Sequence, residues 1–446
     1  MSMKKDRNIT IILIVLLLAT IGLLLNNYFN NLPPTIKKIT YADSYNEDRS
    51  RKVTLKLKKR NSKPIYCTFI HGDDTSEKIK AKNGKCSYNV VTDSYKVDIE
   101  FNNGKHTTYD EEFNIDGLLG FKIVNKKKYI ALDEYLNLGT QLDTVGYMDY
   151  LVKYSSSNED IISIDKDGNI HGNQVGVSTI TVTANNITEK WDIKVSDLIR
   201  PPILNNKKKV VPCNQYSDEQ LKELDDILAS RVEIAGEGTR AAAVEVSRFL
   251  TLDFPYKVPY FYENGRISTN GVDGEGRYYR KGLYLGKAKQ NEIEKVMVGP
   301  ASWGCPLTNF EDDGYMKPNV RYPNGLDCSG YISWILKQAG LDIGDIGAGF
   351  SSKYNYTQVG ELNRNSYELL HSGKVKPGDL IGWDGHIAMI GAMTDTKIYV
   401  TESLLPGVIM DEYDYSNPRS TFYSRYDHII DMSGQYKGDG NLRYMW

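Results

Sequence analysis

Residues 324–340 read NGLDCSGYISWILKQAG, and the C-terminal part of the chain is predicted to form around this stretch. Apolar side chains recur there at near-helical spacing, and Gly340 favours a left-handed helix end. The pattern predicts a buried amphipathic helix with Cys328 in its first turn. Unpaired backbone N–H groups and the helix dipole at that position lower the pKa of a thiol. Cys328 is therefore a candidate nucleophile, and the alternative is a small buried hydrophobic residue.

A histidine opens an apolar run 58 positions after this cysteine. Residues 376–381 read KPGDLI, which predicts a turn and a strand, and residues 385–391 read GHIAMIG, a second strand that begins at His386. A thiol nucleophile needs an imidazole within hydrogen-bond reach, first to hold the ion pair and later to protonate the leaving amine. His386 is the candidate for this role. The rival imidazoles, His371 and His428, do not open a strand behind a glycine.

A third polar group usually accepts a hydrogen bond from the second ring nitrogen and so fixes the imidazole. Glu402 lies on the next predicted strand and is the candidate, because a carboxylate orients and stabilises an imidazolium. The alternative is an ordinary exposed glutamate at a strand end. The predicted catalytic set is therefore Cys328, His386 and Glu402.

These segments resemble the NlpC/P60 family of papain-like cysteine peptidases, which cut peptidoglycan stem peptides. The resemblance is carried by DCSG at 327–330, by KPGDLI and by GHIAMIG, with a weaker match at Ser302-Trp303-Gly304, and it covers residues 296–430. It implies an α+β papain-like domain within residues 217–446 and a cell-surface cysteine peptidase that hydrolyses amide bonds in peptidoglycan stem peptides. The family commonly has His, Asn or Gln as its third residue, and residues 398–402 contain none of these.

Two other classes of function stay open. One is an amidase or acyltransferase on the same fold, because a fold does not determine a reaction. The other is a non-catalytic surface-binding protein or adhesin. The net charge of −2 argues against nucleic acid as a partner, since binding to it needs a basic surface. No His and Cys spacing typical of a metal site is present, so we expect no metal or cofactor. The oligomeric state is not predicted.

The first 30 residues indicate the compartment. Lys4, Lys5 and Arg7 precede a 17-residue apolar run at 9–25, which is just long enough to span a bilayer. Asparagines follow, without the small-residue pattern of a cleavage site. We therefore expect a single-pass membrane anchor with a cytoplasmic N-terminus by the positive-inside rule. The alternative is a cleaved secretion signal, and in both cases the remainder lies outside the cell.

Two β-rich modules are expected to follow the anchor, which makes the chain a multidomain protein. Residues 33–115 alternate apolar and polar side chains between Asn/Gly turns, as in a small all-β, immunoglobulin-like domain. Cys67 and Cys86 lie in this segment, and a disulfide is the expected state in an exported module. The alternative is a pair of reduced core cysteines.

Residues 116–197 contain strands in an order similar to that of bacterial immunoglobulin-like group 2 domains, which implies a second β-sandwich-like module that serves as a spacer or adhesive unit. Residues 198–216 contain Pro201-Pro202 and three consecutive lysines and are expected to form a linker with solvated lysines. A capping box at Ser217 predicts the first helix of the C-terminal domain. Cys213 and Cys305 either pair or stay free.

A Tyr- and Gly-rich stretch runs from residue 254 to about residue 286 and has no assignable pattern. It reads as an insertion that shapes a substrate groove. Its aromatic side chains stack on substrate or, as the commoner alternative, pack in the core; they are Tyr256, Tyr260, Phe261 and Tyr262.

Overall fold

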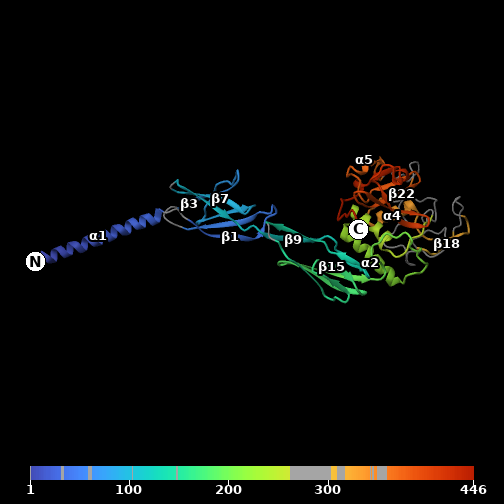
Figure 1. Ribbon diagram of the computed structural model, residues 1–446, viewed down its shortest axis with the longest axis horizontal. Coiled ribbons are helices and arrows are strands. Elements are labelled where there is room, and N and C mark those ends of the chain that lie inside the picture. The colour runs from blue at the N-terminus through green and yellow to red at the C-terminus, as the bar shows by residue number, and fades with distance from the viewer. Residues whose placement is uncertain are drawn as a thin grey trace. The chain divides into compact units, whose positions relative to one another are not determined.

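The computed structural model describes residues 2–31, 35–58, 63–102, 104–146, 149–261, 303–308, 317–341, 343, 346–348 and 359–446. The chain forms two compact units, each described by its own contacts (Figure 1). The first unit comprises Met1–Lys122, Thr140–Val152 and Ala184–Ile187. The second comprises Ile123–Gly139, Lys153–Thr183 and Thr188–Trp446.

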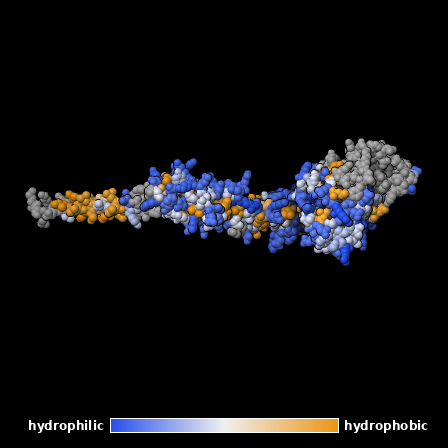
Figure 2. Space-filling model, turned by 90° about the horizontal axis from the view of Figure 1, so that it is seen from above, coloured by the Kyte–Doolittle hydropathy of each residue, from blue (hydrophilic) through white to orange (hydrophobic). Residues whose placement is uncertain are grey.

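The first unit begins with the apolar helix that the sequence predicts. Helix α1 spans Ser2–Asn31, and its segment Ile9–Tyr28 is the one helix within the described residues that is long and apolar enough to cross a membrane. Figure 2 shows this segment as a hydrophobic stretch. Its side chains lie exposed with no protein core to pack against. A helix of this kind serves as a signal peptide or a membrane anchor.

A β-sandwich-like module of the immunoglobulin type follows α1. One sheet has the order β1-β2-β6, and the other has β4-β3-β7-β8 with β5 paired to β3. Val53, Phe69 and Val97 are fully buried between them. Cys67 and Cys86 form a disulfide that joins β3 to β6 and therefore links the two sheets. The strands are β1 (Ile36–Tyr45), β2 (Arg51–Leu57), β3 (Pro64–His71), β4 (Asp74–Thr75), β5 (Ile79–Lys80), β6 (Lys85–Val90), β7 (Ser94–Phe101) and β8 (His106–Glu112).

The second module is also β-sandwich-like. A four-stranded sheet of order β10-β17-β16-β13 faces a three-stranded sheet of order β11-β15-β14, and Ile162, Ile180 and Ile193 are fully buried. Strands β9 and β12 fall in the range expected for this module, but they pair with each other and lie mainly in the first unit. The strands are β9 (Gly117–Ile123), β10 (Tyr129–Ala131), β11 (Tyr135–Asn137), β12 (Thr140–Val145), β13 (Val152–Ser156), β14 (Ile162–Ile164), β15 (Asn169–Gly172), β16 (Gly176–Ala184) and β17 (Ile187–Ser196).

The C-terminal region consists mostly of strands, with helices on its six-stranded antiparallel sheet of order β20-β25-β21-β22-β23-β24. Strand β22 is buried along its whole length: Ile387 and Met389 join the cluster that contains α2, α3 and α4, and Ala388 and Ile390 join the cluster on the other face. The strands are β18 (Pro306–Thr308), β19 (Arg321–Pro323), β20 (Glu361–Arg364), β21 (Leu380–Trp383), β22 (His386–Met393), β23 (Lys397–Leu404), β24 (Gly407–Asp414) and β25 (His428–Asp431).

Three helices of this region, α2, α3 and α4, begin where the sequence predicts, whereas α5, α6 and η5 were not predicted. Ser217 and Gln220 form the expected capping box at the start of α2. Helix α3 passes into a π-helical turn, η1, so that the expected helix at 240–250 changes character at its end. The helices are α2 (Asp218–Ala235), α3 (Arg240–Arg248), η1 (Phe249–Asp253), α4 (Cys328–Gln338), α5 (Tyr367–Leu370), α6 (Thr421–Arg425) and η5 (Ser433–Gln435).

Residues 198–216 are packed on the C-terminal domain and differ in this from the expected linker. The Lys208 ammonium is buried and donates hydrogen bonds to the carbonyl groups of Leu250, Thr251 and Phe254 at 2.9–3.0 Å. The expectation of solvated lysines is therefore wrong at this position, because the π-helical turn leaves carbonyl groups that need donors. Burial, followed by the charge of Arg200, lowers the pKa of Lys208 to about 7.

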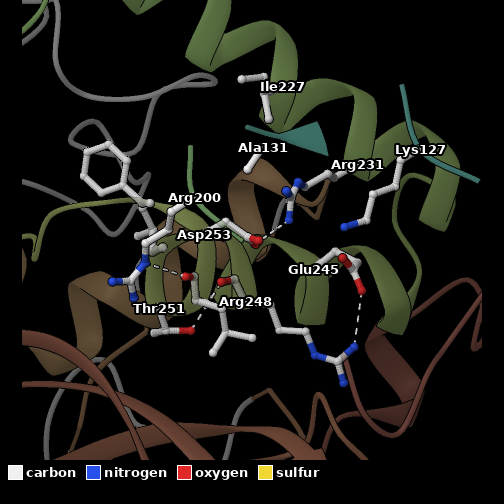
Figure 3. A network of polar contacts seen from close by, with 12 residues as sticks. Lys127, Ala131, Arg200, Ile227, Arg231, Glu245, Arg248, Thr251 and Asp253 are labelled. Carbon is white, nitrogen blue, oxygen red and sulfur yellow. Dashed lines mark hydrogen bonds and ion pairs between the residues drawn. The ribbon is translucent and has the colours of Figure 1, made fainter. Parts of the chain in front are cut away.

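Within the second unit, the immunoglobulin-like module is hydrogen-bonded to α2. Glu223 accepts hydrogen bonds from Lys194 at 2.8 Å and from Ser196 at 2.7 Å, and Lys128 pairs with Glu233. Ala131 of the module shares the hydrophobic cluster of Leu198, Ile227 and the helices. Figure 3 shows the polar network beneath this contact, in which Arg231 pairs with Asp253 and Arg248 pairs with Glu245.

The Tyr- and Gly-rich stretch is described only in part. Phe261 is buried, and the ring of Tyr256 packs on those of Phe254 and Tyr216, so these aromatic side chains belong to the core. Tyr262 lies outside the described residues, as do most of the expected insertion and Ser302.

Candidate active site

Helix α4 begins at Cys328, as the sequence predicts. Asp327 is its N-cap, and the carboxylate accepts a hydrogen bond from the backbone N–H of Gly330 at 2.7 Å. The helix stops at Gly340, whose φ of 88° is the left-handed conformation expected from the sequence. The cap and the stop fix the position of the cysteine at the helix N-terminus.

The segment that leads into α4 is held on two sides. Asn324 donates its backbone N–H to the carbonyl of Cys305, and Cys305 forms a disulfide with Cys213. A Cβ atom at Gly325 would lie 1.9 Å from the carbonyl oxygen of Pro259, so only glycine permits this approach. The open question about Cys213 and Cys305 is thereby answered: they are paired, and their bond anchors the chain just before the nucleophile.

The thiol of Cys328 lies at the beginning of β22. The backbone N–H of Ile387 donates a hydrogen bond to its sulfur, and the preceding residue is His386. Cys328 is 8% exposed and His386 is 3% exposed. The start of α4 therefore lies against the start of β22, one residue after His386.

The imidazole of His386 is fixed by Glu402 on the neighbouring strand β23. The ring atom Nε2 lies 2.7 Å from Oε2 of Glu402, which has no exposed surface. The ring of His386 also stacks on Trp383, with centroids 4.2 Å apart and planes inclined by 26°. With Nε2 engaged by the carboxylate, Nδ1 is the ring nitrogen left for proton exchange with the thiol.

Two further residues contact Glu402 that the sequence did not identify. Arg425, the last residue of α6, donates from Nη2 to Oε1 at 3.0 Å, and the hydroxyl of Tyr426 lies 3.2 Å from the same oxygen. They follow Glu402 by 23 and 24 positions, and no motif links them to it. Their contact with Glu402 is apparent only in the folded chain, where both residues lie beside β23.

The thiol is not activated in the way its helix position predicts. Burial, followed by the neighbouring carboxylate of Asp327, raises the pKa of Cys328 to about 12. Backbone N–H groups, including that of Ile387, lower it by less. The expected lowering of the thiol pKa is therefore wrong, because desolvation of the sulfur outweighs the helix N-terminus. At neutral pH the side chain of Cys328 is therefore a neutral thiol.

The rival imidazoles lie elsewhere. His371 follows α5, and its Nδ1 lies 2.9 Å from the carbonyl oxygen of Tyr367. The imidazole also stacks on the ring of Tyr367. His428 opens β25 and pairs with Gly382, on the side of β21 away from β22. Burial lowers the pKa of His428.

Among the described residues, no group of three or more His, Cys, Asp or Glu side chains is arranged to hold a metal ion. The candidate site contains a thiol, an imidazole and a carboxylate, and the carboxylate is already engaged with the imidazole and with Arg425. The arrangement provides a nucleophile, a proton carrier and an orienting carboxylate, which are the three parts that acyl transfer requires.

Residues 124–195 are a bacterial immunoglobulin-like domain of group 2, since they match the model of that family. No curated protein matches the chain. The chain spans 29% of the solved S-layer protein SbsC, with 11% identity over 38% of this chain and a TM-score of 0.20. Fibronectin(III)-like modules of Clostridium thermocellum CbhA match 36% of this chain and 94% of their own length at 11% identity, TM-score 0.19. Invasin, a bacterial integrin-binding protein, matches 39% of this chain and 40% of its own length at 16% identity, TM-score 0.18.

Proposed function

We propose that this protein is a cysteine hydrolase that cleaves amide bonds in the peptide stems of peptidoglycan. The observation that carries the proposal is the contact of Cys328, at the start of α4, with the start of β22, where His386 is hydrogen-bonded to the buried carboxylate of Glu402. A buried group of Cys, His and carboxylate is better explained by a role in acyl transfer than by a contribution to stability, since burying an ionised group costs free energy.

The arrangement defines a sequence of bond changes. As the sulfur attacks the carbonyl carbon, the thiol proton moves to His386, and Glu402 stabilises the resulting imidazolium. The imidazolium then gives its proton to the departing amine, which leaves a thioester on Cys328. Water, deprotonated by the same imidazole, attacks the thioester and releases the carboxylic acid and the thiol.

The substrate class follows from the resemblance of DCSG, KPGDLI and GHIAMIG to the papain-like NlpC/P60 peptidases. The apolar helix α1 and the immunoglobulin-like domain at 124–195 support a place at the cell surface, where peptidoglycan is the abundant amide polymer. Another amide or ester reaction on the same scaffold, such as that of an amidase or acyltransferase, uses the same three residues.

For topology, we propose that α1 stays uncleaved and anchors the chain with its N-terminus in the cytoplasm. Protease added to wall-stripped cells should then remove the chain beyond about residue 30 and leave a stub in the membrane. A mature N-terminus beyond residue 20 in the culture medium would contradict this.

A second candidate function is that of a non-catalytic surface-binding protein. The match of residues 124–195 to an immunoglobulin-like family favours it, because such modules act by contact and carry no catalytic residues of their own. In this case the C-terminal domain would bind wall peptides without cutting them.

One experiment separates the two functions. Full-length protein in detergent micelles is incubated with defined muropeptides, and the products are identified by mass spectrometry. Cleavage by the wild type and its loss in Cys328→Ala, with retained binding to purified wall, supports the hydrolase. Binding without cleavage by both proteins supports the surface-binding function. Equal cleavage by wild type and Cys328→Ala would overturn the proposed mechanism.

A further inference from the structure

Glu402 occupies an unusual position for a carboxylate, because no part of its side chain is exposed. Charged and titratable groups surround it from three of the elements near β23. His386 comes from β22, Arg425 comes from α6, and Asp411 and Tyr413 come from β24. Tyr426 follows α6 directly. A second carboxylate, Asp411, thus adds its negative field to a site that already contains one.

The two oxygens of Glu402 are used separately. Oε2 faces Nε2 of His386 at 2.7 Å, and Oε1 accepts from Arg425 at 3.0 Å and from the hydroxyl of Tyr426 at 3.2 Å. A carboxylate held at one oxygen cannot rotate about its terminal torsion, which is otherwise a soft one. The contacts at Oε1 therefore determine where Oε2 lies.

Arg425 is itself held in place. Its guanidinium lies over the rings of Trp383 and Tyr426, each at 5.5 Å, and over Tyr413 at 5.9 Å, while its side chain remains 34% exposed. Trp383 stacks on His386 as well. One indole ring therefore contacts both the imidazole and the cation that neutralises its carboxylate partner. Cation–π contacts of this kind favour arginine over lysine.

We propose that Arg425 and Tyr426 are the positioning residues of the thiol site: they hold Oε1 of Glu402 so that Oε2 meets His386 and keeps its ring turned to Cys328. They act through Glu402 and do not touch the reacting atoms. This assignment rests on the proposed hydrolase function, but the geometry it predicts is measurable without substrate.

The first test observes the imidazole directly. A histidine ring N–H that is hydrogen-bonded to a buried carboxylate gives a low-field proton resonance, which ¹⁵N-histidine labelling and His386→Gln assign in the full-length protein. Arg425→Met should shift or abolish this resonance, and Arg425→Lys should restore it only in part, because lysine supplies the charge without the planar fork. Tyr426→Phe should shift it less. Arg419→Met, at an exposed arginine nearby, is the matched control and should leave it unchanged.

The second test measures turnover of the muropeptide. Arg425→Met should lower kcat by roughly tenfold or more while KM changes little, as expected when a residue that holds Glu402 in place is lost. Tyr426→Phe should give a smaller loss of kcat, and a folded Arg425→Lys should lie between Arg425→Met and wild type. A purely structural role would lower thermal stability and leave both the resonance and kcat at wild-type values, and that result would overturn the proposal.

The two tests can contradict the positioning assignment and the proposed function separately. If wild type cleaves no muropeptide but the resonance depends on Arg425, the positioning assignment stands and the proposed function fails. If Cys328→Ala abolishes cleavage but Arg425→Met and Tyr426→Phe change neither the resonance nor kcat, the hydrolase stands and the positioning assignment is wrong.

Discussion

The sulfur of Cys328 experiences two opposing influences. The helix start and the N–H of Ile387 stabilise a thiolate, whereas burial and the charge of Asp327 favour the thiol. Burial prevails, so the protonated form persists until the pH approaches the raised pKa of about 12. In the proposed hydrolase reaction at neutral pH, the proton would have to leave during the attack itself, which would make His386 a general base as well as a general acid.

Alkylation measures this balance. Iodoacetamide should label Cys328 more slowly in the native protein than in denaturant at pH 8, and the native rate should rise continuously toward alkaline pH. Cys328 is the one free thiol among the five cysteines, so mass spectrometry reports it without interference. Native labelling faster than that of the unfolded chain near pH 7 would show a preformed thiolate–imidazolium pair.

The pKa of Glu245 is shifted in the opposite direction to that of Cys328, and this shift makes the stability of the protein depend on pH. Burial opposes its ionisation, but the guanidinium groups of Arg443, Arg248 and Arg231 lower its pKa to about 2. A carboxyl with a depressed folded-state pKa stabilises the protein above its ordinary value of 4.5, and this contribution is lost as the pH falls toward 2. Glu245→Gln should therefore reduce the unfolding free energy at pH 7 by about 3 kcal/mol at most.

The difference between wild type and Glu245→Gln should shrink as the pH falls below about 4. Glu412→Gln is the control, because this glutamate is 40% exposed and pairs with Lys397 at the surface. Its effect should stay within about 0.5 kcal/mol at pH 7. Chemical denaturation at several pH values measures both variants, and a pH-independent loss for Glu245→Gln would contradict the assignment.

At the scale of single residues, the sequence identifies chemistry by residue type and order. Cys328 at a helix start and His386 at a strand start follow from local patterns, and both positions are found in the structure. Arg425 and Tyr426 escape prediction because they meet Glu402 only through sheet packing. The direction of the cysteine pKa escapes it too, since burial is a property of the folded chain.

At the scale of elements, periodic patterns predict best. The capping box before α2 and the glycine stop after α4 are local in sequence, and they are observed where expected. Pairing between strands is not local. The partnership of β9 with β12, and the packing of residues 198–216 against η1, depend on contacts from distant parts of the chain. No short window of sequence contains that information.

The segment before α4 gives a test at this scale. Replacing Cys213 and Cys305 together by serine opens a loop of 92 residues, and loop entropy predicts a loss of roughly 4–5 kcal/mol. Because Cys305 holds Asn324, kcat for muropeptide should fall as well. Thermal unfolding and turnover, measured on the same samples, check both expectations.

The matched control is the double replacement of Cys67 and Cys86. It opens a shorter loop of 19 residues in the other unit, so it should cost about 3 kcal/mol there and leave kcat unchanged. Equal kcat values in both double variants would show that the disulfide before α4 has no role in placing the nucleophile.

At the scale of the whole molecule, most of the immunoglobulin-like module at 124–195 belongs to the same compact unit as the C-terminal domain; residues 140–152 and 184–187 belong to the first unit. A flexibly linked spacer would make few contacts with the C-terminal domain. Glu223 joins the module to α2 through Lys194 and Ser196, and Lys128 pairs with Glu233. The module is therefore part of the framework that supports the helices behind β22.

This arrangement predicts one calorimetric transition for the module and the C-terminal domain. Glu223→Ala should lower the midpoint of this transition and reduce the free energy of unfolding by about 1 kcal/mol, because two hydrogen bonds are lost. Asp226→Ala is the control, since Asp226 is half exposed and forms its ion pair with Lys222 of the same helix rather than a hydrogen bond to the module. Two separate transitions, with only one displaced by Glu223→Ala, would show that the module folds on its own.

The burial of Cys328 also bears on survival in an oxidising environment. Outside the membrane, where we place this domain, no glutathione pool returns a sulfenic acid to the thiol. Oxidation by peroxide requires thiolate character and access, and Cys328 is 8% exposed with a pKa of about 12. The four other cysteines are already paired, so no neighbouring thiol draws it into disulfide exchange. If Cys328 is the nucleophile of the proposed hydrolase, this burial keeps it reduced in the resting protein without a repair partner, and it is open to oxidants only during the proton transfer to His386.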